Sequence, residues 1–268
     1  MSLGIVVLSP SGIVLAADSR VTLNATNNLT GETLTVNYDN ATKLLRFNEP
    51  NNFVGAVTWG QAIIPGENRT AESYVPEFEA SLKAGKRYPI QEFARALSDF
   101  FVDQWKTAAV GYVGPEMIFQ VAGYDEKAAY GHAFQFTVPQ NPTPVEHVPM
   151  GTFSISWGGQ TDMVDRMIRG FGQTLPGKIA SALGLDPAQQ AALDAILTAE
   201  QWQFPIHLMP LQDCVSLVLS VMRGTVAMQQ LAVTLRGVGG PIDLVTITRT
   251  AGLQAIQFKE VYGDDRDR

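Results

Sequence analysis

The chain has 268 residues, a formal net charge of -7 and a pI near 5.0, with 46% of its residues hydrophobic and 17% charged. This balance predicts a sizeable core, and the negative field argues against a nucleic-acid partner, because no basic cluster is longer than Lys86-Arg87. An apolar run of the roughly 20 residues that a membrane span needs is missing, as is a signal-peptide pattern. We therefore expect a cytoplasmic chain with no membrane partner.

Four strands are predicted before any helix. Residues 3–8 and 13–17 are apolar runs around the turn Ser9-Pro10-Ser11-Gly12, which is typical of a hairpin. Residues 22–40 are polar, and their Asn and Thr content predicts a loop. Two further short strands are expected at 42–47 and 53–58.

The period then changes to that of helices. Between residues 70 and 107, apolar residues recur at helical spacing, and Gly85 to Pro89 divides this region into two predicted helices. Strands are expected again at 117–124, 128–138 and 152–156, with residues 139–149 as a Pro-rich excursion.

Helical spacing returns after residue 163, continues through an Ala-rich stretch, and ends in a long apolar helix over about 211–231. Residues 242–248 and 253–258 predict a closing hairpin. Runs of strands followed by runs of helices favour an α+β fold with antiparallel sheets and segregated helical layers. We predict one domain over residues 1–262, an insertion at about 176–210, and a charged tail at 263–268.

Four segments carry a resemblance to a known family. They are 12–20 (GIVLAADSR), 41–47 (ATKLLRF), 54–60 (VGAVTWG) and 238–244 (VGGPIDL). Together they resemble strands and the Gly-Gly turn of proteasome β-type subunits and bacterial proteasome-related N-terminal-nucleophile (Ntn) hydrolases. The resemblance implies a four-layer αββα sandwich, with two antiparallel sheets between helical layers, and a ring-like homo-oligomer.

The resemblance also implies site residues. The family's nucleophile heads the mature chain sixteen positions before the motif aspartate, and in this sequence that position is Ser2, with Asp18 as the aspartate. Lys43 corresponds to the family's lysine, and backbone N–H groups near Trp59 and Gly60 to its oxyanion site. Removal of Met1 would expose the α-amine of Ser2.

This set of residues suits amide hydrolysis through an acyl-enzyme. A serine hydroxyl needs a base, and a free α-amine has an ordinary pKa near 8. A lysine ammonium lowers the pKa of nearby groups, and a carboxylate keeps that lysine ionised and in place. The implied substrate is a peptide or a small amide, with no cofactor and no metal.

Departures from the family pattern keep other interpretations open. The family's auxiliary aspartate and serine align with residues 235–238, which offer neither type, and its remaining serine aligns near residue 158, where Ser156 or Gln160 could substitute. An inactive assembly subunit with the same fold is the alternative. In that case Asp18 would cap a turn, Lys43 would lie on the surface, and Gly60 would end a strand.

Cysteine and histidine offer no competing centre. Cys214 is the only cysteine and has apolar neighbours, which predicts an inert buried thiol. His132, His147 and His207 lie in separate segments without the spacing of metal ligands.

Overall fold

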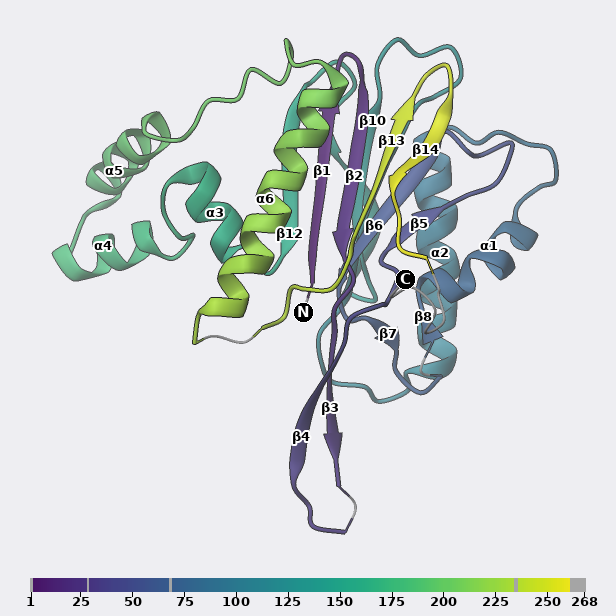
Figure 1. Ribbon diagram of the computed structural model, residues 1–268, viewed down its shortest axis with the longest axis horizontal. Helices are drawn as coiled ribbons and strands as arrows, with labels where there is room; N and C mark the ends of the chain where they lie inside the picture. The colour runs from purple at the N-terminus through teal and green to yellow at the C-terminus, as the bar shows by residue number, and fades with distance from the viewer. Residues whose placement is uncertain (1, 28, 68, 234–235, 261–268) are drawn as a thin grey trace, which may run out of the picture.

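The computed structural model describes residues 2–27, 29–67, 69–233 and 236–260. Two five-stranded antiparallel sheets form its centre (Figure 1). The first sheet has the order β12-β1-β2-β13-β14, with β1 (Leu3–Ser9), β2 (Gly12–Asp18), β12 (Ser154–Gly159), β13 (Ile242–Thr248) and β14 (Gly252–Gln257). The second has the order β11-β10-β9-β6-β5, with β5 (Leu44–Arg46), β6 (Val54–Gly60), β9 (Met117–Gly123), β10 (His132–Val138) and β11 (Asn141–Val148).

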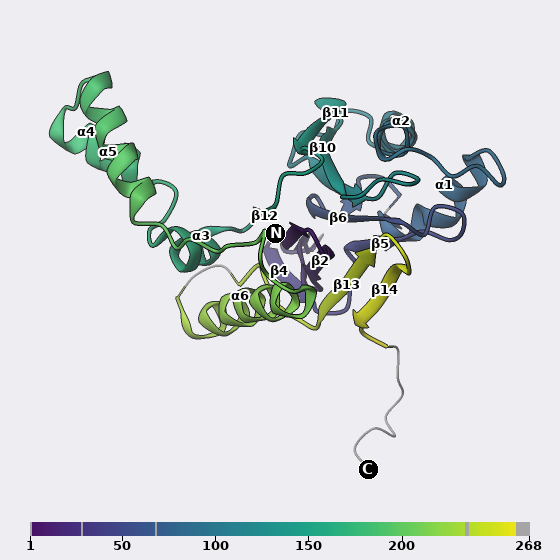
Figure 2. The same ribbon diagram turned by 90° about the horizontal axis from the view of Figure 1, so that it is seen from above.

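Helices pack on the outer faces of both sheets. A short 3-10 helix (Glu72–Tyr74), α1 (Val75–Ser81) and α2 (Ile90–Ala108) cover the second sheet, while α3 (Asp162–Arg169) and α6 (Leu211–Leu231) cover the first. Helices α4 (Leu175–Leu183) and α5 (Pro187–Ala199) extend away from both sheets (Figure 2). Neither α4 nor α5 has a buried residue.

Three apolar clusters explain why these segments fold this way. Every residue of β1 and β2 is buried, because one face packs on α3 and α6 and the other on the second sheet. Strands covered on both faces are apolar throughout instead of alternating. The cluster between the sheets, here called the inter-sheet core, includes Val6, Leu15, Val57, Trp59 and Val245.

The expected four-layer αββα sandwich is wrong as a description of this chain. The described residues form four antiparallel sheets and six α-helices, including two-stranded sheets of β3 (Val21–Thr26) with β4 (Thr33–Tyr38) and of β7 (Ile63–Ile64) with β8 (Arg69–Thr70). The β3–β4 ribbon projects beyond the large sheets (Figure 1). Strand β4 and helices α4 and α5 bury no apolar face against a sheet, so they add no layer.

Two predicted loops turn out to be strands. The polar segment 22–40 forms the β3–β4 ribbon, whose register pairs Val21 with Tyr38 and Thr26 with Thr33. Most of the Pro-rich excursion 139–149 forms β11, which is one of the two edge strands of the second sheet. An edge strand tolerates proline because one row of its N–H groups needs no partner.

Other predicted elements lie close to where they were expected. Both helices between residues 70 and 107, the long apolar helix and the closing hairpin are present as α1, α2, α6 and β13–β14. The single domain over 1–262 with its insertion stays a prediction, and the tail 263–268 lies outside the described residues.

Helix α6 was not expected to meet the membrane criterion, yet it does. Within the described part of the chain it is long and apolar enough to cross a bilayer by length and composition alone. A buried helix in a globular core passes the same test, and Cys214, Val218 and Met222 of α6 pack against the first sheet. Meeting this criterion is therefore weak evidence that α6 spans a membrane.

Candidate active site

Asp18 lies at the end of β2 and is completely buried. Its Oδ1 accepts hydrogen bonds from the Lys43 ammonium at 2.7 Å and from the Leu3 N–H at 2.9 Å. Its Oδ2 accepts from the N–H groups of Gly239 at 3.0 Å and Arg20 at 3.2 Å. Four donors satisfy this carboxylate, which is what burial of a charge requires.

Lys43 lies directly before β5 and reaches from the second sheet to the first. It is buried, and besides Asp18 its ammonium also donates to the carbonyl of Arg20. Burial lowers the pKa of Lys43, while the charge and hydrogen bond of Asp18 oppose that effect. The chain thus places a buried ammonium with a reduced pKa between its two sheets.

Ser2 lies directly before β1 and is also buried. Its carbonyl accepts a hydrogen bond from the N–H of Gln160 at 2.7 Å. The next N–H along the chain, that of Leu3, shares Asp18 Oδ1 with the Lys43 ammonium. One carboxylate oxygen therefore fixes both the start of β1 and the position of the lysine.

Trp59 and Gly60 lie at the same end of the first sheet as Ser2. The Trp59 side chain packs so closely on β1 and β12 that a Cβ added to Gly158 would lie 2.3 Å from the indole, and one added to Gly4 2.9 Å. Trp59 Cβ and the Ser2 carbonyl oxygen both lie within 3.4 Å of the point that a Cβ on Gly159 would occupy. Gly60, the next residue, has a φ of +85° that favours glycine.

The backbone of β6 directs N–H groups toward Lys43 and β5, here called the lysine strand because Lys43 directly precedes it. The Thr58 N–H donates to the Lys43 carbonyl at 2.9 Å. Because successive N–H groups alternate along a strand, the Gly60 N–H faces the same edge, beyond the point where β5 begins. The structure therefore brings Ser2, Asp18, Lys43 and Gly60 to one end of the paired sheets, while their catalytic roles stay predictions.

Of the two substitutes considered for the family's remaining serine, one is near Ser2. Gln160 contacts Ser2 through its backbone. Ser156 pairs with Val6, four residues along β1 from Ser2 and so about 13 Å away, and its hydroxyl accepts from Gln120 Nε2 at 2.8 Å. Ser156 is therefore not part of this site.

The segment before the Gly-Gly turn touches the site through its backbone. Leu235 lies outside the described residues. Val238 is buried, and its N–H donates to Gln229 Oε1 at 2.8 Å, while the Gly239 N–H binds Asp18. In the described part of this segment, the turn thus supplies peptide groups where the family pattern has side chains.

Two ion pairs next to the site were missed from the sequence. Arg20 and Asp39 close the base of the β3–β4 ribbon at 2.5 Å and 2.7 Å, and the hydrogen bonds from Arg20 lower the pKa of the Asp39 carboxyl. Asp243 and Lys259 form a second buried pair beside Asp18. One sign of the second pair was visible in the sequence, because Asp243 is the single charged residue in the apolar segment IDLVTIT.

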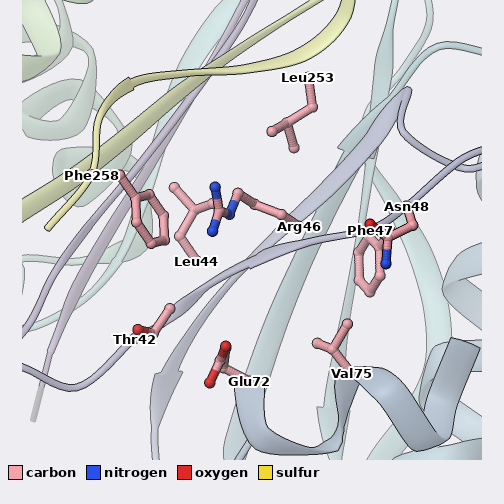
Figure 3. A pocket seen from close by; sticks show the side chains of 9 residues that line it. All are labelled: Thr42, Leu44, Arg46, Phe47, Asn48, Glu72, Val75, Leu253 and Phe258. Carbon is pink, nitrogen blue, oxygen red and sulfur yellow. The ribbon is translucent and has the colours of Figure 1, made fainter. Parts of the chain in front are cut away.

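A cavity of about 350 Å³ opens beside the lysine strand (Figure 3). Thr42 and Leu44, the neighbours of Lys43, line it together with Arg46 and Phe258, whose ring lies 3.9 Å from the Arg46 guanidinium carbon. Ser2, Asp18 and Lys43 are not among its lining residues, so the cavity flanks the site and does not contain it.

The described residues contain no cluster of side chains that could bind a metal ion. No group of three or more His, Cys, Asp or Glu side chains among them is arranged to hold an ion. His132 contacts Glu146 through Nδ1 at 3.0 Å and Asp125 through Nε2 at 3.3 Å, so the two carboxylates lie on opposite sides of the ring.

The paired sheets, with a buried aspartate and lysine beside the start of β1, define the fold of this chain. Solved Anbu proteins share this fold. The Anbu complex from Pseudomonas aeruginosa, described as a helical assembly, is 14% identical, with a TM-score of 0.54 over 99% of this chain and 88% of that one.

Two further Anbu structures match similarly. Anbu from Hyphomicrobium sp. strain MC1 is 15% identical, with a TM-score of 0.56 over 99% of this chain and 89% of its own. Anbu from Yersinia bercovieri, described as an ancestral β-subunit, is 13% identical, with a TM-score of 0.53 over 96% and 88%. No protein-family model and no curated protein matches the sequence.

These comparisons correct the resemblance drawn from the sequence. The structural neighbours are Anbu proteins, not proteasome β-type subunits themselves. At these identities the likeness concerns the fold alone. The motifs in β2, β5 and β6 are too short to separate the two groups.

Proposed function

We propose that the chain is an N-terminal-nucleophile amide hydrolase, a proteasome-like peptidase in which Ser2 becomes the nucleophile once Met1 is removed. The observation that carries this proposal is the sharing of Asp18 Oδ1 between the Lys43 ammonium and the Leu3 N–H. This link ties the position of Ser2 to a buried positive charge.

The proposed reaction begins with the α-amine of Ser2 taking the proton from Ser2 Oγ. The oxygen forms a bond to the amide carbonyl carbon, and the Gly60 N–H donates to the resulting oxyanion. The proton then passes to the leaving nitrogen, the C–N bond breaks, and an amine departs. Water hydrolyses the remaining ester by the same route and releases an acid.

Lys43 acts on this reaction through its charge. Its ammonium favours the ionised hydroxyl and the neutral amine, both of which the attack requires. Burial strengthens that influence, because water screens the charge less between the sheets. Asp18 holds the ammonium in place and is not itself in contact with the substrate.

Intact mass spectrometry of the purified full chain tests the proposal. We expect loss of Met1 and, after treatment with a β-lactone, a mass increase equal to the whole lactone, because ring opening by Ser2 Oγ loses no atoms. Ser2→Ala should abolish the adduct. Ser9→Ala, at the other end of β1, is the matched control and should retain it.

Three outcomes would overturn the proposal. They are an adduct that persists in Ser2→Ala, hydrolysis that survives a residue added before Ser2, and a chain that keeps Met1 and never reacts. The last would favour the alternative, an inactive assembly subunit. If the chain hydrolyses a small amide but no peptide, the proposed mechanism stands and the chain is an amidase instead of a peptidase.

We also propose that the chain forms homo-oligomers. Large apolar side chains lie exposed on and just beyond α4 and α5, among them Leu183, Ile196 and Trp202 at 62–69% exposure. Exposed apolar side chains that form a patch mark sites of association. The structural neighbour from Pseudomonas aeruginosa is described as a helical assembly.

A further inference from the structure

A second buried ion pair lies beside the candidate site. Asp243 is completely buried on β13, and the ammonium of Lys259 donates to its Oδ2. The backbone N–H of Lys259 donates to Oδ1 of the same carboxylate at 3.0 Å. The Lys259 side chain is only 11% exposed, so this pair is built into the fold and is not a surface contact.

Strand register places this pair next to Asp18. Strand β13 pairs with β2 so that Ile242 lies opposite Asp18 and Asp243 opposite Ala17. Ile242 and Leu244 pack toward α6, whereas Val245 belongs to the inter-sheet core. Because side chains alternate along a strand, Asp243 faces the space between the sheets. Phe258, the neighbour of Lys259, lines one cavity together with Thr42 and Leu44, the neighbours of Lys43.

The segment that carries Lys259 is fixed across the edge of that space. Gln257 Nε2 donates to the Ile242 carbonyl at 2.8 Å. Phe258 packs on the inter-sheet core and against the Arg46 guanidinium. Residues 257–259 thus join the first sheet to the lysine strand, and Lys259 has a defined position from which its charge can act.

We infer that Asp243 and Lys259 are a positioning pair for the proposed hydrolase, in which Lys259 sets the electrostatic environment of Lys43 and Asp243 holds Lys259 in place. This inference rests on the proposed function only for its catalytic consequence. Asp18 and Asp39 attract the Lys43 ammonium, whereas Arg20 and Lys259 repel it. Repulsion by Lys259 is accordingly among the causes that lower the pKa of Lys43.

Single neutral substitutions separate this role from a purely structural one. Lys259→Gln leaves the Asp243 carboxylate alone, so the pKa of Lys43 should rise. Asp243→Asn leaves the Lys259 ammonium alone, so that pKa should fall. For a charge that water screens so little, the expected shift is on the order of one pH unit. If the ion pair only held residues 257–259 in place, the two substitutions would not shift the pKa of Lys43 in opposite directions.

The primary measurement is the ¹⁵Nζ chemical shift of Lys43 as a function of pH, in the full chain labelled with ¹⁵N-lysine and assigned by its loss in Lys43→Arg. The pH profile of β-lactone acylation is the second readout and should move in the same directions. Lys86→Met, which breaks an exposed ion pair with Glu92, is the matched control and should leave the Lys43 titration unchanged.

The charge-swapped variant Asp243→Lys with Lys259→Glu serves where a single variant does not fold. It keeps an ion pair but reverses its field, so the pKa of Lys43 should rise. Shifts in the same direction, or no shift in either single variant or the swap, would overturn the inference. The titration is readable even if Ser2 proves unreactive, so failure of the proposed function and failure of this inference are distinguishable.

Discussion

Among single residues, Asp18 contributes both to the stability of the fold and to the proposed chemistry. Its carboxylate accepts four hydrogen bonds and is the carboxylate that the buried Lys43 ammonium contacts. Asp18→Asn leaves that ammonium uncompensated, and breaking a buried pair in this way costs about 3–5 kcal/mol. Urea unfolding should register the loss, whereas Asp103→Asn, in an exposed pair, should change stability by less than about 0.5 kcal/mol.

If the large effect came from lost shape and not from charge, the double variant Asp18→Asn with Lys43→Met would be as unstable as Asp18→Asn. We expect it to recover part of the loss, because removing both partners leaves no buried charge.

The lowered pKa of Lys43 also predicts how stability depends on pH. Above the folded-state pKa of Lys43 and below its ordinary value of 10.5, the unfolded chain binds a proton that the folded chain does not. The free energy of unfolding then rises with pH in this window. Comparison of the wild type with Lys43→Met between pH 7 and 10 should show the steeper rise in the wild type; equal slopes would contradict the lowered pKa.

Part of the candidate site could be predicted from the sequence because its residues lie in short motifs with strong local patterns, while their catalytic roles stay predictions. Asp18 ends an apolar strand and Lys43 directly precedes one, so both are conspicuous. Lys259 could not be found in this way, since its importance depends on a register between β2 and β13 that joins residues more than 200 positions apart. The contact of Gly239 with Asp18 was equally invisible, because a peptide N–H carries no mark in the sequence.

At the scale of elements, α2 shows what a helical period can predict. Phe93, Leu97, Phe101 and Trp105 were expected on one face and are buried against the second sheet. The period did not predict the aromatic cluster they join, in which the Phe93 ring lies 4.7 Å from Phe47 and 5.3 Å from Phe78. That cluster brings together three elements whose contacts depend on the fold.

Phe93→Ala should therefore destabilise the chain by about 3–5 kcal/mol, because it opens a cavity in a fully packed cluster. Chemical unfolding followed by circular dichroism measures this change. Gln91→Ala, on the exposed side of the same helix, is the control and should lie within about 0.5 kcal/mol of the wild type. A small loss in Phe93→Ala would mean that the cluster is looser than described.

The ribbon and β11 show where element prediction failed. Residues 22–40 have few large apolar side chains, so no burial signal marked β3 and β4, although backbone pairing and the Arg20–Asp39 contact hold them. In β11, Pro142 and Pro144 argued against a strand, but an edge position removes that objection. Both errors arose because pairing partners, not local composition, decided the structure.

At the scale of the whole molecule, α4 and α5 stand apart from the cores and carry exposed apolar side chains. If this surface joins copies of the chain, Ile196→Asp should shift the mass measured by light scattering toward the monomer. Asp194→Asn on the same helix is the control and should leave the mass unchanged. A monomeric wild type would contradict the proposed self-association.

The central position of β1 and β2 has a consequence for how the chain is made. These two strands are synthesised well before their neighbours in the sheet, β12 and β13. At about 5–20 residues per second, Asp18 waits roughly 10 to 45 seconds for β13 and the glycine that binds it. During that delay the nascent chain holds an apolar hairpin with two open edges, which favours contact with chaperones.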